Sequence, residues 1–83
     1  AIAVERKSLP DYISTIIHAR GRFAQELAKL REYPFAWIVV EGSLDEVLHG
    51  RYASRVHPAA LMGLTMLVMT EYRIPVLFAH DRP

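Results

Sequence analysis

The stretch Ala1–Asp11, AIAVERKSLPD, runs from a short apolar segment through a dense charged cluster into the start of a helix. Side chains alternate between the two faces of a strand, so Glu5 and Lys7 share one face and Arg6 lies on the other. A carboxylate beside an ammonium at a strand end can hold a divalent cation and a phosphate. We therefore expect the rest of the chain to act as a scaffold for this cluster.

The length and composition of the chain limit it to one small domain. Its 83 residues bury only a modest share of their surface on folding, and without cysteine no disulfide stabilises the core. Hydrophobic residues make up 52% of the chain, a high share at this length. This excess predicts that a partner subunit or further chain covers part of the apolar surface. We expect residues 1–83 to form a single, truncated domain.

The charge of the chain bears on whether it binds nucleic acid. The formal net charge is +1, so no strong overall field attracts nucleic acid. Guanidinium groups suit bidentate contact with phosphate, although each arginine fits an ordinary solvent-exposed role equally well. The arginines that we take as candidates for contact with nucleic acid are Arg20, Arg22, Arg51 and Arg55.

The apolar segments do not indicate a membrane protein. The longest, residues 59–69, is too short to span a bilayer, and the N-terminus lacks the charged-then-apolar pattern of a signal peptide. We expect an intracellular protein, in the cytoplasm or nucleoid of a prokaryote or the nucleus of a eukaryote, with no membrane partner.

The order of apolar patterns predicts an α/β domain. Steps of three and four mark helices, and near-continuous apolar runs mark parallel strands covered on both faces. The predicted elements are a strand at 1–5, two helices between 9 and 33 with a break within 18–21, a strand at 35–40, helices at 44–49 and 58–72, and a strand at 76–79. This order predicts a three-layer domain with parallel strands, right-handed crossovers and helices on both faces of a central sheet. The sheet looks incomplete at both ends of the chain.

The last predicted helix is apolar on nearly every face. Such a helix is expected to be buried on all sides. Its methionines indicate core or a dimer interface rather than a cofactor site.

Polar residues follow each predicted strand. They are Glu5-Arg6-Lys7, Glu41-Gly42 and His80-Asp81, which would meet at one edge of a parallel sheet. The spacing of Glu5 and Lys7 is half of the motif of metal-dependent phosphodiesterases, in which a carboxylate holds Mg²⁺ and a lysine handles water or phosphate. This pair alone is a weak signal. Glu41 is a secondary candidate, since Glu-Gly at a strand end is more often a turn.

The longer string Val4-Glu5-Arg6-Lys7-x-x-x-Asp11 resembles the ERKxxxD signature of the XPF-type structure-specific endonucleases, in the restriction-endonuclease-like superfamily. Residues 21–27, 37–42 and 74–78 also resemble successive segments of that family. Stand-alone bacterial, archaeal and phage members are the most similar. The resemblance covers nearly the whole chain and implies a central mixed sheet with helices on both faces.

The resemblance implies a DNA-repair endonuclease that uses Mg²⁺ or Mn²⁺ to hydrolyse phosphodiester bonds in branched, flap or fork DNA. It implies Glu5 as a metal ligand, Lys7 as the cation that handles water or phosphate, and Arg6 and Asp11 as further catalytic residues. It also implies branched or nicked duplex DNA as a partner and assembly as a homodimer or heterodimer. The family's other acidic metal ligands would precede Ala1.

Two other functions stay open. A non-catalytic nuclease-like subunit would bind DNA junctions or a partner nuclease, and an unrelated α/β domain would use the same charges as caps and surface. Asp11 has the spacing of a capping box with Ser8, and Arg22 could pair with Glu26 one turn later. The intact signature favours the nuclease.

Overall fold

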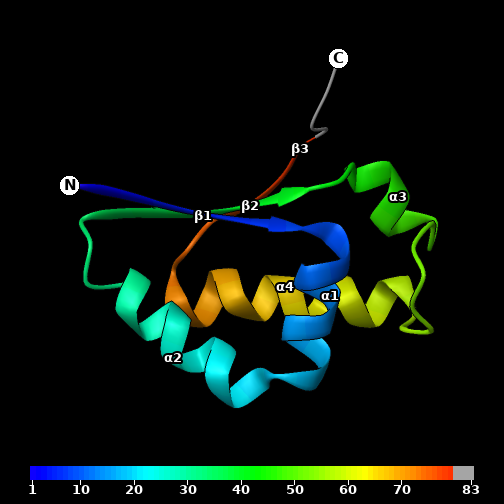
Figure 1. Cartoon of the computed structure of the whole chain (residues 1–83), viewed down its shortest axis with the longest axis horizontal. Helices are drawn as coiled ribbons and strands as arrows, with labels where there is room; N and C mark the ends of the chain where they lie inside the picture. Colours follow the sequence, from blue (N-terminus) through cyan, green and yellow to red (C-terminus); the bar gives the residue numbers. More distant parts are fainter. Residues whose placement is uncertain (80–83) are drawn as a thin grey trace.

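The computed structural model describes residues 1–79 and contains the predicted elements in the predicted order (Figure 1). The elements are β1 (Ile2–Ser8), α1 (Leu9–His18), α2 (Arg20–Leu30), β2 (Phe35–Glu41), α3 (Leu44–Leu48), α4 (Pro58–Tyr72) and β3 (Val76–Ala79). The predicted break between the first two helices falls at Ala19. The predicted polar pair His80-Asp81 lies outside the described residues.

The three strands form a parallel sheet in the order β1-β2-β3. β1 extends through the charged cluster to Ser8, further than predicted, because its backbone continues to pair with β2 as far as Glu41. Ladder hydrogen bonds use the backbone, so charged side chains do not end the strand. Glu5 and Lys7 lie opposite Ile38 and Val40 in this register.

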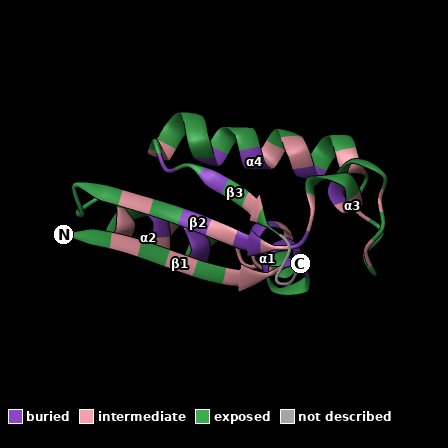
Figure 2. Cartoon of the chain, turned by 90° about the horizontal axis from the view of Figure 1, so that it is seen from above, coloured by how far each residue is buried: buried purple, intermediate pink, exposed green. Residues whose placement is uncertain are grey.

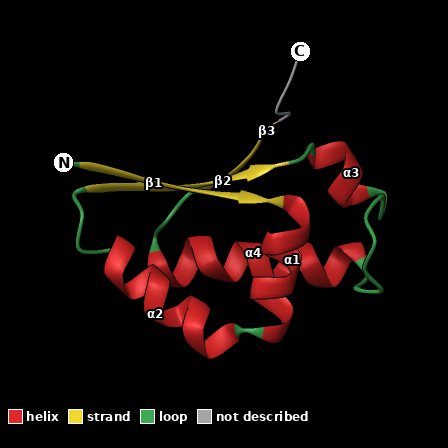
Figure 3. Ribbon diagram, in the orientation of Figure 1, coloured by secondary structure: helices red, strands yellow, loops and turns green. Residues whose placement is uncertain are grey.

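The α/β class is confirmed, but within residues 1–79 the sheet is wholly parallel and α1, α2 and α4 lie along one face (Figure 3). The predictions of a mixed sheet and of helices on both faces are therefore not met in this part of the chain. The strand order explains the difference. Each crossover steps in the same direction across the sheet, and right-handed crossovers in one direction fall on one face.

The other face of the sheet carries large apolar side chains. Exposed residues alternate with more buried ones along β1 and β2 (Figure 2). The large exposed side chains of this open sheet face are Ile2, Val4, Phe35, Trp37 and Leu77. Burying such side chains is favourable, so this face is suited to contact with further protein.

The core lies between the sheet and the helices, around Tyr12. Its ring meets those of Phe23 and Phe78 edge to face, with centroids 6.4 and 6.2 Å away. The Thr65 hydroxyl donates to the Leu61 carbonyl at 2.9 Å, so the Tyr12 hydroxyl donates to Thr65 Oγ1, 2.6 Å away. Burial raises the pKa of Tyr12 to about 12.

The prediction that the last helix is buried on all sides is wrong within the described residues. The buried residues of α4 are Leu61, Thr65 and Val68, whereas Met66 and Leu67 are 58% and 53% exposed. The sheet covers one side of α4, and the single helical layer does not enclose the other. Among residues 1–79, none of the helices combines the length and hydrophobicity needed to cross a membrane.

Candidate active site

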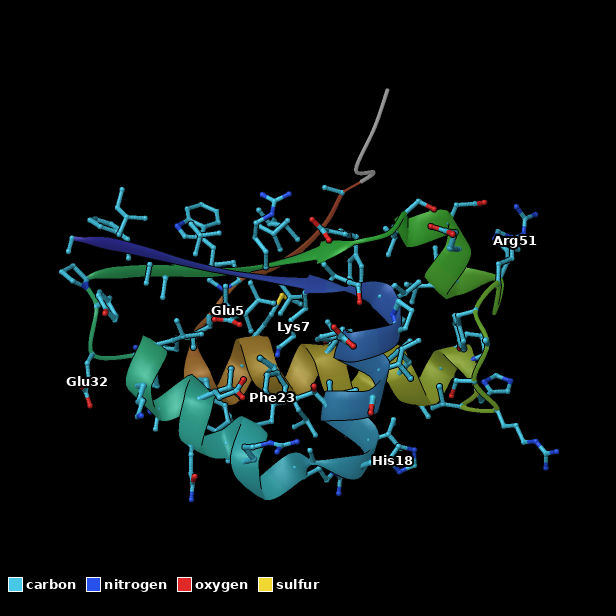
Figure 4. All side chains as sticks on the ribbon, in the orientation of Figure 1. Glu5, Lys7, His18, Phe23, Glu32 and Arg51 are labelled. Carbon is cyan, nitrogen blue, oxygen red and sulfur yellow. The ribbon has the colours of Figure 1, made fainter. Side chains whose placement is uncertain are left out.

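The predicted catalytic residues lie at the end of β1 and the start of α1. Glu5 and Lys7 point from β1 toward the helices, as Figure 4 shows. Arg6 is exposed on the opposite, open sheet face, and Asp11 is exposed in the first turn of α1. The structure therefore brings Glu5 and Lys7 together and separates Arg6 from them, as strand alternation predicts.

Lys7 lies between two carboxylates. Its Nζ is 4.0 Å from Glu5 Oε2 and 3.5 Å from Glu26 Oε1. The Lys7 side chain is 13% exposed, against 45% for Glu5 and 40% for Glu26. The ammonium is thus held beneath the sheet at the end of β1, with opposite charge on two sides.

Glu26 is a site residue that sequence reasoning missed, since its spacing from Arg22 suggested only a pair within the helix. The sequence does contain a signal for its position. Glu26 follows Phe23 by three residues and precedes Leu30 by four, so it lies on the inward stripe of α2. A carboxylate on that stripe needs a cation, and β1 supplies Lys7.

Arg6 forms an ion pair with Glu41 across the two strands. Both Nη2 and Nε of Arg6 approach the same carboxylate oxygen, Oε2, at 3.2 and 3.4 Å. The arginine and glutamate side chains are 62% and 35% exposed, so the pair contributes little to stability. Glu41, the secondary candidate, is therefore placed with Arg6 on the open sheet face.

Asp11 lies in the first turn of α1, where the Ser8 side chain forms the N-cap. Its backbone N–H donates to Ser8 Oγ at 3.2 Å, which is half of the predicted capping box. Its carboxylate lies in the first turn of α1, where negative charge complements the helix dipole. The Asp11 side chain is exposed beside the end of β1 and is therefore accessible.

The candidate arginines do not form one cluster. Arg51 and Arg55 line a groove of about 900 Å³ between α1 and the loop that precedes α4. Arg51 also pairs with Asp45 at 3.2 Å, both side chains being exposed. Arg20 lines a separate groove between α2 and α4, and Arg22 is exposed on α2.

The groove beside Arg51 adjoins the strand ends. Its walls include Pro10 and Ser14 of α1, and Glu41 from the end of β2. It therefore extends along α1 from its first turn to His18.

The described residues do not complete a metal site by themselves. No group of three or more histidine, cysteine, aspartate or glutamate side chains within residues 1–79 is placed to hold an ion. Glu5 offers one carboxylate, and the positive charge of Lys7 close beside it disfavours binding of a metal cation there. Mg²⁺ is nevertheless often held by one or two carboxylates together with water and substrate phosphates.

This arrangement defines a class: an α/β domain with a parallel sheet and a Glu-x-Lys pair at the end of its first strand. Comparison with known proteins then identifies the family. The sequence profile of the ERCC4 domain matches residues 1–83, so the chain belongs to the ERCC4 domain family.

A solved structure supports this assignment. XPF from Aeropyrum pernix has a similar structure, with a TM-score of 0.74 and 27% sequence identity over 96% of this chain. The chain spans 37% of the length of that relative. No curated protein matches the chain. The predicted resemblance to XPF-type nuclease domains is confirmed by the family match and this structural match.

Proposed function

We propose that the chain is the catalytic domain of an endonuclease that hydrolyses phosphodiester bonds in branched, flap or fork DNA. The observation that carries the proposal is the Glu5–Lys7 pair at the end of a parallel strand. Its carboxylate is about half exposed and its ammonium is mostly buried. Membership of the ERCC4 domain family supports a nuclease-type role in DNA processing.

In this mechanism a water oxygen bonds to the scissile phosphorus and releases a proton to solvent as the bond to the leaving oxygen breaks. Charge then develops on the non-bridging oxygens, and the Lys7 ammonium stabilises it. Lys7 also orients the attacking water against the phosphate. The leaving oxygen takes up a proton from solvent.

Arg6 and Asp11 complete the proposed catalytic set. Asp11 offers an exposed carboxylate beside the end of β1 for orienting water. Arg6 is held by an exposed pair with Glu41, and exposed ion pairs are worth only about 0–1 kcal/mol. A DNA phosphate can therefore replace Glu41 as its partner at little cost.

We further propose that cleavage requires Mg²⁺ or Mn²⁺, with Glu5 as one ligand. When bound, such an ion supplies Lewis-acid stabilisation of the phosphate. The single carboxylate fits an ion held jointly with DNA phosphate, water or further chain, rather than one held by residues 1–79 alone.

The proposed partners are branched or nicked duplex DNA and a second subunit. Arg20, Arg22, Arg51 and Arg55 supply exposed guanidinium groups for phosphate contact. The open sheet face and the exposed side of α4 offer apolar surface for a homodimer or heterodimer. An intracellular location follows from a DNA substrate and belongs to the same proposal.

The decisive experiment compares Glu5→Ala and Lys7→Ala with the matched exposed variants Glu32→Ala and Lys29→Ala. We expect the first two to lose cleavage of a flap or fork substrate in Mg²⁺ while keeping their fold and DNA affinity. The two controls should cut normally. Undiminished cutting by either site variant would contradict the proposal.

A non-catalytic nuclease-like subunit is the second candidate. The observation that favours it is the lack, within residues 1–79, of a three-ligand metal group. Such a subunit would bind flap or fork DNA and cut none of it in Mg²⁺ or Mn²⁺. The same assay on the unchanged protein therefore separates the two functions.

A further inference from the structure

We propose that Glu26 is a positioning residue that holds the Lys7 ammonium in place for catalysis. This inference rests on the proposed function, in which Lys7 acts on the scissile phosphate. It adds a residue from α2 to a site otherwise built from β1 and α1. Glu26 acts through Lys7 and does not touch the DNA.

The contact itself is the first observation. Glu26 Oε1 lies 3.5 Å from Lys7 Nζ, closer than the 4.0 Å that separates the ammonium from Glu5 Oε2. Glu26 Oε1 is buried and has no hydrogen-bond partner among the described residues. A buried, unpaired carboxylate oxygen is costly, so the ammonium is the group that satisfies it. A small approach of Lys7 would turn the ion pair into a charge-assisted hydrogen bond.

The packing of α2 against the core is the second observation. Phe23 and Leu27, on either side of Glu26, are 4% and 2% exposed and fix this face of the helix against the core. The Lys7 side chain is a flexible four-carbon stem with a point charge at its tip. A carboxylate on a packed helix restrains that tip in a way that the strand alone does not.

The third step concerns the separate roles of the two carboxylates, Glu5 and Glu26. Glu5 lies two residues before Lys7 on the same strand face and is the carboxylate proposed to bind metal. If Lys7 relied on Glu5 alone, ammonium and metal would compete for the same oxygens. Glu26 supplies a separate counter-charge, which leaves Glu5 free. Without Glu26, the ammonium would be held only loosely and would spend part of its time near Glu5, away from the phosphate.

The test uses Glu26→Gln in the intact protein, because glutamine keeps the size of the side chain and removes only its charge. Misplacing a catalytic group by about 1 Å costs on the order of 100-fold, so we expect kcat on flap DNA to fall about 10- to 100-fold. The KM for DNA should not change. Glu26→Asp keeps the charge with shorter reach and should recover part of the loss. Glu32→Gln, exposed beyond α2, is the control.

A readout that does not need activity accompanies the kinetics. In ¹⁵N-lysine-labelled protein without DNA, the Lys7 ammonium signal should become more mobile in Glu26→Gln and stay unchanged in Glu32→Gln. Unchanged Lys7 mobility, or an equal loss of kcat in Glu32→Gln, would overturn the inference. So would a rise in KM or a lower unfolding midpoint that accounts for the lost rate. If the unchanged protein cuts no DNA, the proposed function fails, and the Lys7 signal still decides whether Glu26 holds Lys7.

Discussion

At the residue scale, Gly42 sets how closely α1 approaches the end of β2. A Cβ at this position would lie 3.1 Å from both Cβ and Cδ2 of Leu9, the first residue of α1. Leu9 is buried, so it has little room to move. We therefore interpret the Glu41-Gly42 pair as a packing requirement beside the candidate active site, in addition to a strand end.

Gly42→Ala is expected to lower the free energy of unfolding by about 1–3 kcal/mol, the usual cost of overpacking. It should also reduce any activity, since Leu9 follows directly after the signature strand. Denaturant unfolding measures the first effect. Gly63→Ala is the matched control, because nothing beyond its chain neighbours and the nearby backbone of α4 lies within 4 Å of its added Cβ, and alanine suits the interior of a helix. Equal unfolding midpoints for Gly42→Ala and the unchanged chain would contradict this account.

Tyr12 makes stability depend on pH in the alkaline range. Its pKa rises from 10.0 in the unfolded chain to about 12 in the core, because burial disfavours the phenolate. Between these values the unfolded chain has lost a proton that the folded chain retains, so stability falls as pH rises. Tyr12 makes its full contribution to the free energy of unfolding below pH 10 and loses it as the pH passes 12. The contribution is about 2–3 kcal/mol. In urea unfolding, Tyr12→Phe should lack this fall in stability between pH 10 and 12. An unchanged fall would mean that other groups cause it.

At the scale of elements, local patterns predicted the helices and strands well, because their signals are local. Ser43 and Glu46, three residues apart, form a complete capping box at the start of α3, with bonds of 2.7 and 3.0 Å. Strand alternation likewise placed Glu5 and Lys7 on one face. The apolar stripe of α2 indicates that Glu26 faces inward, but the strand residue that it meets depends on how helix and strand pack, and no local pattern encodes that pairing.

The end of α4 contains a strained residue that offers a test. Arg73 has φ 57°, in the left-handed region where glycine is favoured. Arg73→Gly is therefore expected to stabilise the chain by about 0.5–1 kcal/mol in thermal or denaturant unfolding. Arg31 occupies the corresponding position of α2 at φ −65°, so Arg31→Gly should destabilise it. If both substitutions lower stability, the backbone at 73 carries no strain.

At the scale of the whole molecule, two predictions depended on how elements assemble. Strand order is set by long-range packing, so local patterns did not show that α1, α2 and α4 share one face. The composition did indicate excess apolar surface. That excess appears as the open sheet face and as the exposed Met66 and Leu67 of α4. The second helical layer implied by the family resemblance would lie over the open sheet face.

The electrostatics of the proposed DNA binding also belong to the whole molecule. Its net charge of +1 gives no strong general attraction to DNA. The proposed binding would then depend on local groups such as Arg51 and Arg55, which line the groove that adjoins the strand ends. Removing one side chain that neutralises a phosphate lowers the slope of log K against log salt by about 0.9.

The double variant Arg51→Ala/Arg55→Ala is therefore expected to reduce the salt slope of flap-DNA binding by about 2, measured by fluorescence anisotropy over a range of salt concentrations. Arg31→Ala/Arg73→Ala removes the same charge from exposed positions outside the groove and should shift the slope little. The comparison separates local phosphate contact from net charge, since both variants carry the same charge. Parallel salt plots for the two double variants would mean that the groove does not contact the DNA backbone, and that the duplex lies elsewhere on the surface.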